Sequence, residues 1–281
     1  MAFQTVFKRY ELKYIITGEQ KEKILHAMNK YMKRDKYGRT VIRNIYFDTD
    51  DFILARHSIA KPDFKEKMRI RSYGRASADS TVFVELKRKF DHVVYKRRIP
   101  MSESNAMKWT AGVSAESDEK SQIQREIDYF LSYYGNLHPV AFLSYEREAY
   151  KMLPQYDSDF RVTFDENLLF RESDISLNSE VYGKPVLREG KILMELKCSG
   201  GIPMWMTKVL SEEHVYKTSF SKYGTAYKCY IQPALADRRR KMTEKRADEP
   251  RNRRGVHPEK KGAGMRRTGW AAFRHAMSPG A

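Results

Sequence analysis

The chain has 281 residues, of which 41% are hydrophobic, and this is enough to bury one substantial core or two small ones. Its 53 Lys and Arg residues outnumber 36 Asp and Glu residues, and the net charge of +17 indicates an anionic partner such as polyphosphate, nucleic acid or an acidic membrane. Two cysteines exclude a disulfide framework, the N-terminus lacks the apolar segment of a signal peptide, and no run approaches the roughly 20 apolar residues that span a bilayer, so we expect a soluble cytoplasmic protein.

Apolar residues recur with period two between Thr5 and Leu196, in segments rich in Val, Ile, Phe and Tyr that are separated by turn-forming residues. This pattern predicts eight strands, at residues 5–16, 41–48, 65–73, 81–90, 93–100, 140–152, 158–170 and 190–197. Several connections are short, and no strand–helix–strand rhythm occurs. We therefore expect an antiparallel sheet that closes into an eight-stranded tunnel barrel.

Two longer segments have apolar residues at helical spacing. Residues 18–33 have a stripe that includes Ile24 and Met28, and residues 120–134 have one that includes Ile127 and Phe130. Shorter helices are predicted at residues 103–110, 203–212 and 219–231. These helices are expected to flank the barrel, which makes the fold class α+β and mainly antiparallel β.

The composition changes sharply after residue 236. In residues 237–281, basic residues outnumber acidic ones 14 to 5, and β-branched residues are almost absent. Such a segment is too polar to bury a core. We therefore expect a folded domain at residues 1–236 and a basic, disordered tail at residues 237–281.

The residues that alternate with the apolar ones are mostly basic. In residues 81–89, Val82, Val84 and Leu86 point to one face of the predicted strand, and the other face has Phe83, Glu85, Lys87 and Lys89. Similar rows are Lys65, Lys67, Arg69 and Arg71; Lys96 and Arg98; Arg9, Glu11 and Lys13; Tyr145 and Arg147; Arg161, Thr163 and Asp165; and Glu195 and Lys197.

Two interpretations of these rows are open. On any one strand, the row could be the solvent face of a half-exposed antiparallel sheet. A solvated face normally mixes charges of both signs, however, because like charges on neighbouring strands repel each other. Rows of Lys and Arg on many strands favour a lumen that holds a polyanion, since eight closed strands leave room for side chains or one slim ligand.

A phosphate chain is the polyanion that best suits such a lumen. It repeats one anionic group per short unit, and guanidinium groups bind phosphate oxygens bidentately. Phosphoryl transfer also requires a divalent cation, which carboxylates bind. Glu195 is the first candidate metal ligand, followed by Glu11 and Glu85.

Nine stretches, in order along residues 5–232, resemble the catalytic domain of the vacuolar transporter chaperone (VTC) polyphosphate polymerases, a branch of the triphosphate tunnel metalloenzymes. They are KRYELKY (8–14), IRNIYFDT (42–49), KMRIRSYG (67–74), VFVELKRK (82–89), VVYKRRI (93–99), LSYEREAY (143–150), RVTFDENL (161–168), MELKCSGGIPMW (194–205) and SFSKYGTAY (219–227). The resemblance implies an eight-stranded antiparallel tunnel with helices outside it.

The resemblance also implies roles for individual residues. The candidate catalytic residues are Arg69, Arg71, Lys87, Lys96 and Arg147. The candidate substrate-binding residues are Lys13, Lys67, Lys89, Arg98, Tyr145, Arg161, Lys197, Ser221 and Lys222. Glu195 matches the family's metal-binding glutamate, and the metal implied is Mn²⁺ or Mg²⁺.

One departure bears on the reaction. The wider superfamily has a Glu-x-Glu-x-Lys signature on its first strand, and here that place reads Arg9-Tyr10-Glu11-Leu12-Lys13. A base replaces one carboxylate, which favours the polymerase branch over two-metal hydrolysis.

The predicted function is therefore a polyphosphate polymerase, which transfers the γ-phosphate of ATP onto a growing inorganic polyphosphate chain. Two alternatives stay open: a triphosphate or tripolyphosphate hydrolase of the same fold, and a non-catalytic module that binds polyphosphate or RNA. ATP and inorganic polyphosphate are the expected partners, and nucleic acid is expected only through the basic tail.

Overall fold

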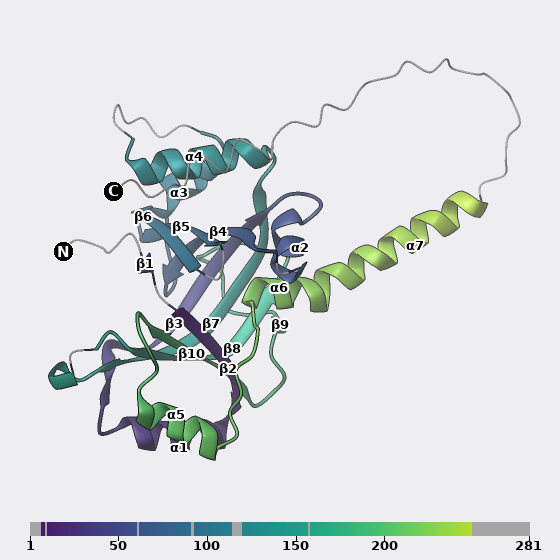
Figure 1. Cartoon of the computed structure of the whole chain (residues 1–281). Helices are drawn as coiled ribbons and strands as arrows, with labels where there is room; N and C mark the ends of the chain where they lie inside the picture. Colours follow the sequence, from purple (N-terminus) through teal and green to yellow (C-terminus); the bar gives the residue numbers. More distant parts are fainter. Residues whose placement is uncertain are drawn as a thin grey trace, which may run out of the picture. The chain divides into compact units, whose positions relative to one another are not determined.

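A computed structural model of the chain describes residues 7–8, 10–60, 62–90, 93–113, 120–156 and 158–248. The chain divides into two units, residues 1–236 and 237–281. The first unit is built on a mainly antiparallel sheet with flanking helices (Figure 1). Among the described residues, no helix is long and apolar enough to cross a membrane.

The sheet contains ten strands among the described residues. Their bounds are β1 Phe7–Lys8, β2 Tyr10–Thr17, β3 Met32–Asp48, β4 Phe64–Tyr73, β5 Thr81–Phe90, β6 Val93–Ser102, β7 His138–Met152, β8 Arg161–Arg171, β9 Lys184–Pro185 and β10 Lys191–Cys198. Neighbours pair in the order β1-β6-β5-β4-β3-β7-β8-β10-β2, with β9 paired to β8, and all pairs are antiparallel.

The two ends of this order are formed by consecutive parts of the chain. β1 pairs with β6 and β2 pairs with β10, and only residue 9 separates β1 from β2. A contact of 2.7 Å between Lys87 on β5 and Glu11 on β2 also joins strands that are not neighbours in the sheet. The sheet therefore curls towards itself. The predicted antiparallel sheet with flanking helices is confirmed, whereas the hydrogen-bonded path is open and closure into a barrel stays a prediction.

Helices lie on both sides of the sheet (Figure 1). Their bounds are α1 Gly18–Met28, α2 Ile53–Ala60, α3 Glu103–Thr110, α4 Gln122–Tyr134, α5 Met204–Glu212, α6 Lys222–Ala226 and α7 Gln232–Asp248, with a short 3-10 turn at Pro154–Tyr156 and a π-helical segment at Tyr227–Ile231. Helices α3 and α4 lie near β5 and β6, and α1 and α5 lie on the opposite side, near β2 and β10 (Figure 1).

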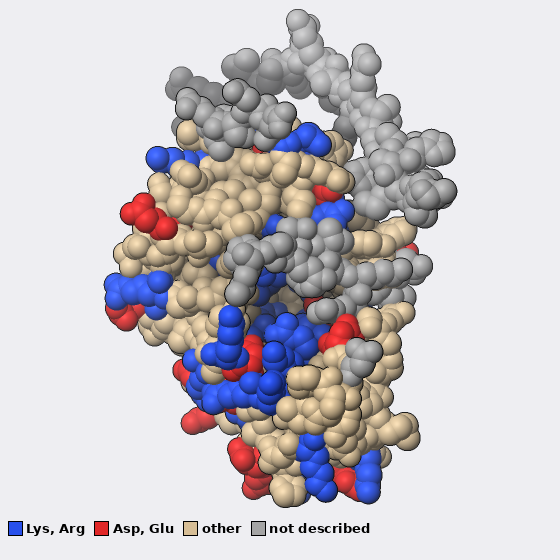
Figure 2. All heavy atoms as spheres, turned by 90° about the vertical axis from the view of Figure 1, so that its left-hand side faces the viewer, with Lys and Arg blue, Asp and Glu red and all other residues tan. Residues whose placement is uncertain are grey.

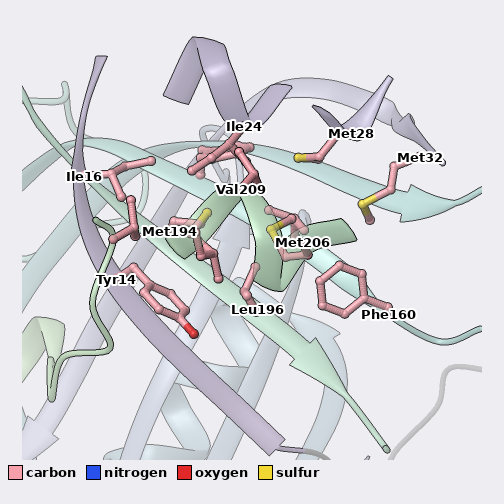
Figure 3. Close-up of a cluster of buried hydrophobic side chains, with 14 of the residues drawn as sticks. Tyr14, Ile16, Ile24, Met28, Met32, Phe160, Met194, Leu196, Met206 and Val209 are labelled. Atoms are coloured by element: carbon pink, nitrogen blue, oxygen red, sulfur yellow. The ribbon is translucent and has the colours of Figure 1, made fainter. Parts of the chain in front are cut away.

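Three clusters of buried apolar side chains hold these layers together. The first joins α1 and α5 to β2, β8 and β10, and includes Ile16, Ile24, Met194 and Met206 (Figure 3). The second joins the outer faces of strands β3, β4, β5, β6 and β7 to helices α2, α3 and α4. The third fills part of the inner face, where residues of β3, β7 and β8 pack against α2 and α6. The alternation of faces therefore separates the first two clusters, on the outer face of the sheet, from the third.

Three local predictions differ from the structure. The helix predicted at residues 18–33 ends at Met28, because residues from Met32 onwards pair with β7 as the polar first half of β3. Helix α2 was not predicted. The first part of the predicted disordered tail, residues 237–248, is helical as the continuation of α7, where Arg240 and Glu244 form an i,i+4 ion pair; residues 249–281 lie outside the described residues.

Candidate functional site

Charged side chains from seven strands and from α6 meet on the inner face of the sheet, together with the hydroxyl groups of Tyr145 and of Ser221, the N-cap of α6. We call this set the inner cluster. It consists of Glu11, Lys13, Lys67, Arg69, Arg71, Glu85, Lys87, Lys96, Tyr145, Arg147, Asp165, Glu195, Lys197, Ser221 and Lys222. The strands supply these residues because their apolar neighbours occupy the outer cores, as Val82, Val84 and Leu86 do on β5.

Glu195 on β10 is surrounded by four cationic groups. Its Oε1 lies 3.2 Å from Lys222 Nζ and 3.7 Å from Lys13 Nζ. Its Oε2 lies 3.3 Å from both Arg147 Nη2 and Lys197 Nζ. Burial alone would raise the pKa of this carboxyl, but the surrounding cations outweigh burial and hold the pKa well below its usual value. Glu195 is therefore ionised.

Asp165 on β8 is the second carboxylate of this region, and its side chain is fully buried. Its two oxygens accept hydrogen bonds from Arg147 Nε at 2.5 Å and Arg147 Nη2 at 2.6 Å, and Lys222 Nζ lies 2.6 Å away. Burial raises the pKa of Asp165, but the charges of Arg147 and Lys222 lower it by more than burial raises it. The net shift of the pKa is therefore downward. Asp165 thus fixes both cations in place.

Glu85 on β5 is the counter-ion of a second group of cations. Its carboxylate lies 2.7 Å from Arg69 Nη2, 2.5 Å from Lys96 Nζ and 3.8 Å from Arg71 Nε. Burial, opposed in part by Glu85, lowers the pKa of Lys96 to about 7. The inner cluster therefore contains two centres, one around Glu195 and Asp165 and one around Glu85.

Neutral side chains orient the two arginines of β4. Arg69 Nη1 donates to the Tyr46 hydroxyl at 2.9 Å, and Arg71 donates to Asn44 Oδ1 and to the Tyr145 hydroxyl, both at 2.9 Å. These contacts join β4 to β3 and β7 across the inner face. Both guanidinium groups are thus held in fixed directions before any ligand binds.

Lys67 lies at the junction between β4 and α6. Its Nζ donates to Ser221 Oγ at 2.6 Å. Burial and then the neighbouring charges of Lys13 and Lys87 hold the pKa of Lys67 well below its usual value. The protonated form of Lys67 is therefore disfavoured until an anion enters this region.

Three of the predicted binding residues are not included in the inner cluster, although Arg98 lies directly opposite Glu85 in the β5–β6 ladder. The Arg161 side chain is 44% exposed and lies 3.8 Å from Asp35. Arg98 is stacked over the Phe83 ring, with 3.8 Å between the guanidinium carbon and the ring centre. Lys89 is half-buried near the end of β5. All other predicted site residues belong to the inner cluster.

Cations outnumber carboxylates in the inner cluster, so its own ion pairs leave excess positive charge. Figure 2 shows Lys and Arg side chains gathered around a hollow on one face of the molecule. An anionic chain that enters can compete with Glu85, Asp165 and Glu195 for their cations. The arrangement is therefore suited to binding a linear polyanion.

Asp165, Asn44 and Tyr46 were not predicted as site residues, although Asp165 belongs to the predicted row on β8. A signal was present for Asn44 and for Asp165. Asn44 interrupts an apolar run of β3 and is fully buried, and Asp165 is an acid within a buried strand. Buried charged and amide groups need hydrogen-bond or ion-pair partners, so a buried polar residue indicates that other polar residues lie beside it.

A divalent cation at Glu195 would have to take most of its ligands from a substrate and from water. Among the described residues, no group of three or more His, Cys, Asp or Glu side chains is placed to hold a metal ion. Glu195 offers a carboxylate, and Thr163, opposite it in the β8–β10 ladder, has a buried hydroxyl without a hydrogen-bond partner in the described part of the chain. Mg²⁺ is commonly held by one or two carboxylates together with phosphate oxygens and water.

Acid is expected to destabilise the inner cluster. The pKa values of Glu85, Asp165 and Glu195 are lower in the folded chain than in the unfolded chain, so their ion pairs contribute stability above about pH 4, where the unfolded carboxyls ionise. This contribution is lost as the pH falls through the folded pKa values. We expect the urea midpoint of unfolding to fall steadily from pH 5 to pH 3. An unchanged midpoint over this range would contradict the assigned ion pairs.

Comparisons with known proteins identify the family and several structural relatives. The family model described as the VTC domain matches residues 8–231. No curated protein sequence matches the chain. The structure is similar to a candidate adenylate cyclase from Bacillus halodurans, with a TM-score of 0.47 and 15% identity over 78% of this chain and 96% of that chain. It is also similar to a candidate adenylyl cyclase from Hippeastrum described as having a dominant triphosphatase activity, with a TM-score of 0.45 and 16% identity over 79% and 96% of the two chains.

Proposed function

Since the chain belongs to the VTC domain family, we propose that it is a polyphosphate polymerase, which transfers the γ-phosphate of ATP onto a growing inorganic polyphosphate chain. The observation that supports this most is the convergence of Lys and Arg side chains from six strands and α6 in the inner cluster. A long row of fixed cations matches a repeating anion better than it matches a compact one.

The proposal includes a tunnel. The chain segment formed by β1 and β2 pairs with β6 at its start and with β10 over the rest of its length. Contacts between Lys87 and Glu11 cross the same junction. In this proposal the sheet encloses the phosphate chain, and the inner cluster lines the enclosed space.

The triphosphate of ATP is assigned to the Glu85 centre, where Arg69, Arg71 and Lys96 meet, with Lys87 beside it. The arginines present several N–H donors each. Tyr46 orients Arg69, and Asn44 and Tyr145 orient Arg71, which reduces the ordering that binding requires. Mn²⁺ or Mg²⁺ would be held by Glu195, and when bound it supplies positive charge to phosphate oxygens.

The acceptor phosphate is assigned to Arg147, Lys222 and Lys197, near Asp165 and Glu195. A phosphate oxygen of the acceptor attacks the γ-phosphorus, the bond to the β-phosphate oxygen breaks, and nucleoside diphosphate leaves. Both reactants are anionic, so the main barrier is electrostatic. The excess positive charge of the inner cluster lowers this barrier without a protein nucleophile. Arg161, which is exposed, is assigned only to the path by which the chain reaches the cluster.

The test is incubation of the full chain with ATP and either Mn²⁺ or Mg²⁺, followed by sizing of the products on a gel and by assay of inorganic phosphate. The proposal requires acid-labile polymer that accumulates with nucleoside diphosphate. A hydrolase would instead release inorganic phosphate without polymer, and a binding module would leave ATP intact. Either result from folded protein excludes the polymerase.

Glu195→Gln is the variant that tests the metal assignment. It keeps the size of the side chain but removes the charge that Mn²⁺ or Mg²⁺ requires, so we expect polymer formation to fall by about 100-fold or more. Glu180→Gln is the matched control, because Glu180 is exposed and pairs with Arg75 away from the inner cluster. Equal activity of the two variants would remove Glu195 from the metal site.

A further inference from the structure

Helix α6 is the start of a continuous helical segment, which runs on through Tyr227–Ile231 into α7, and it brings two side chains to the inner cluster. Ser221, its N-cap, accepts hydrogen bonds from Gly224 N at 3.0 Å and from Lys67 Nζ at 2.6 Å. Lys222 contacts both Asp165 and Glu195. The position of this helix start relative to the sheet depends on the contacts that residues 221–224 make with other elements.

Asp48, at the end of β3, provides the principal contact. Its side chain is fully buried, and its oxygens accept hydrogen bonds from the backbone N–H groups of Thr49, Leu54 and Ala55, each at 2.9 Å. The Tyr223 hydroxyl donates to the same carboxylate at 2.8 Å. A single carboxylate thus joins the end of β3, the start of α2 and helix α6.

The turn that Asp48 holds is strained. Phe52, within it, has a φ of 57°, a value that a bulky side chain rarely adopts. Such a conformation persists only where surrounding contacts enforce it, and it is commonest near functional sites. The three backbone hydrogen bonds to Asp48 are contacts of this kind.

Tyr223 also connects α6 to a phosphate-binding residue. Its ring stacks on Tyr46, with ring centres 4.8 Å apart and planes at 17°. The hydroxyl of Tyr46 accepts a hydrogen bond from Arg69. Tyr223 is therefore joined to β3 through Asp48 and through Tyr46, and this fixes the direction in which Ser221 and Lys222 point.

Close packing at Gly224 keeps α6 in this position. A Cβ at Gly224 would lie 3.0 Å from Ser221 Oγ and 3.3 Å from Ser58 Oγ on α2. The helix therefore sits directly against α2, and a small rotation would move Ser221 and Lys222 out of contact with Lys67 and Asp165.

We propose that Asp48 and Tyr223 are positioning residues for phosphate binding, acting through Ser221 and Lys222 on α6. Neither residue touches the phosphate chain. This inference rests on the proposed function, because it assumes that the inner cluster binds a chain of phosphates.

The first measurement is the affinity of the full chain for tripolyphosphate, by calorimetry without metal or nucleotide. Tyr223→Phe removes one hydroxyl and should weaken binding about tenfold, as expected for loss of a hydrogen bond to a charged group. Tyr230→Phe is the matched control, because the Tyr230 hydroxyl donates to the Pro185 carbonyl, outside the inner cluster, and its loss should leave the affinity unchanged.

A double-mutant cycle separates positioning from a general loss of structure. If Tyr223 acts through Lys222, then Tyr223→Phe should change the affinity little in a Lys222→Met background. Asp48→Asn should likewise add little to Tyr223→Phe. Additive effects in both cycles would show that the pair stabilises the fold only, and would overturn the inference.

The remaining outcomes are also decisive. Wild-type chain that binds tripolyphosphate no better than a Tyr223→Phe variant overturns the positioning role and leaves the proposed function standing. Wild-type chain that binds no tripolyphosphate overturns both. If Asp48→Asn fails to fold, the Tyr223→Phe cycle still decides the question, because that substitution removes a single oxygen.

Discussion

Arg69→Ala is expected to lower the rate of polymer formation by about 100-fold or more. Loss of a hydrogen-bond donor that stabilises a transition state typically has an effect of this size. Arg69 contacts Glu85 at 2.7 Å and Tyr46 at 2.9 Å, so its guanidinium has a fixed direction in the free protein. Alanine removes both the charge and the N–H donors. The measurement is the initial rate of polymer synthesis from ATP with Mn²⁺ at saturating nucleotide.

Arg88→Ala is the matched control for this prediction. Arg88 lies on the neighbouring strand β5 and points to the outer face, where it contacts Glu66 at 2.6 Å and Glu126 at 3.5 Å. The Arg88→Ala substitution removes one positive charge from the chain, as Arg69→Ala does, but it leaves the charges of the inner cluster unchanged. If Arg88→Ala lowers the rate as much as Arg69→Ala does, the effect is a general one of net charge, and the assignment of Arg69 fails.

The carboxylates of the inner cluster explain how so many cations can be buried together. A buried charge without a counter-ion costs several kcal/mol, so a row of unpaired Lys and Arg would oppose folding. Glu85, Asp165 and Glu195 each contact two or more cations. Under the proposed function, phosphate binding would therefore be an exchange of ion pairs, in which substrate oxygens replace protein carboxylates.

The fold was largely predictable because its strands bury one face and place charges on the other. The eight predicted strands correspond to β2, β3, β4, β5, β6, β7, β8 and β10. The first half of β3 was missed because it is held by pairing with β7 rather than by apolar burial, and its register shifts between Arg34 and Arg39. The start of α2 depends on Asp48, which acts through backbone contacts that no periodicity reveals.

The candidate site was less predictable than the fold. Period two gives the face on which a residue lies but not its position along the strand, so Arg161 and Arg147 were equivalent in the sequence, although one is exposed and the other contacts Asp165. Contacts between strands that are not neighbours, such as that of Lys87 with Glu11, depend on the curl of the whole sheet.

Asp165→Asn is expected to destabilise the chain by about 3 kcal/mol, because it removes one partner of a buried ionic group. Asp165 is the bidentate acceptor for Arg147 and the closest anion to Lys222. Glu195 lies 3.3 Å from Arg147 and 3.2 Å from Lys222, so it remains as a counter-ion for both cations in the variant. The expected loss of stability is therefore at the lower end of the range for broken buried ion pairs. Urea unfolding at pH 7 measures the change.

The same variant should respond more strongly than the wild type to a phosphate chain. With Asp165 neutral, Arg147 and Lys222 lack their main counter-ion, so tripolyphosphate supplies charge that the protein no longer provides, and its binding shifts unfolding through mass action. Glu166→Gln is the control, since Glu166 is the next residue on β8 but pairs with Lys21 and Arg39 on the outer face. If tripolyphosphate raises the midpoint of Asp165→Asn no more than that of Glu166→Gln, then Asp165 is not the anion that a phosphate chain replaces.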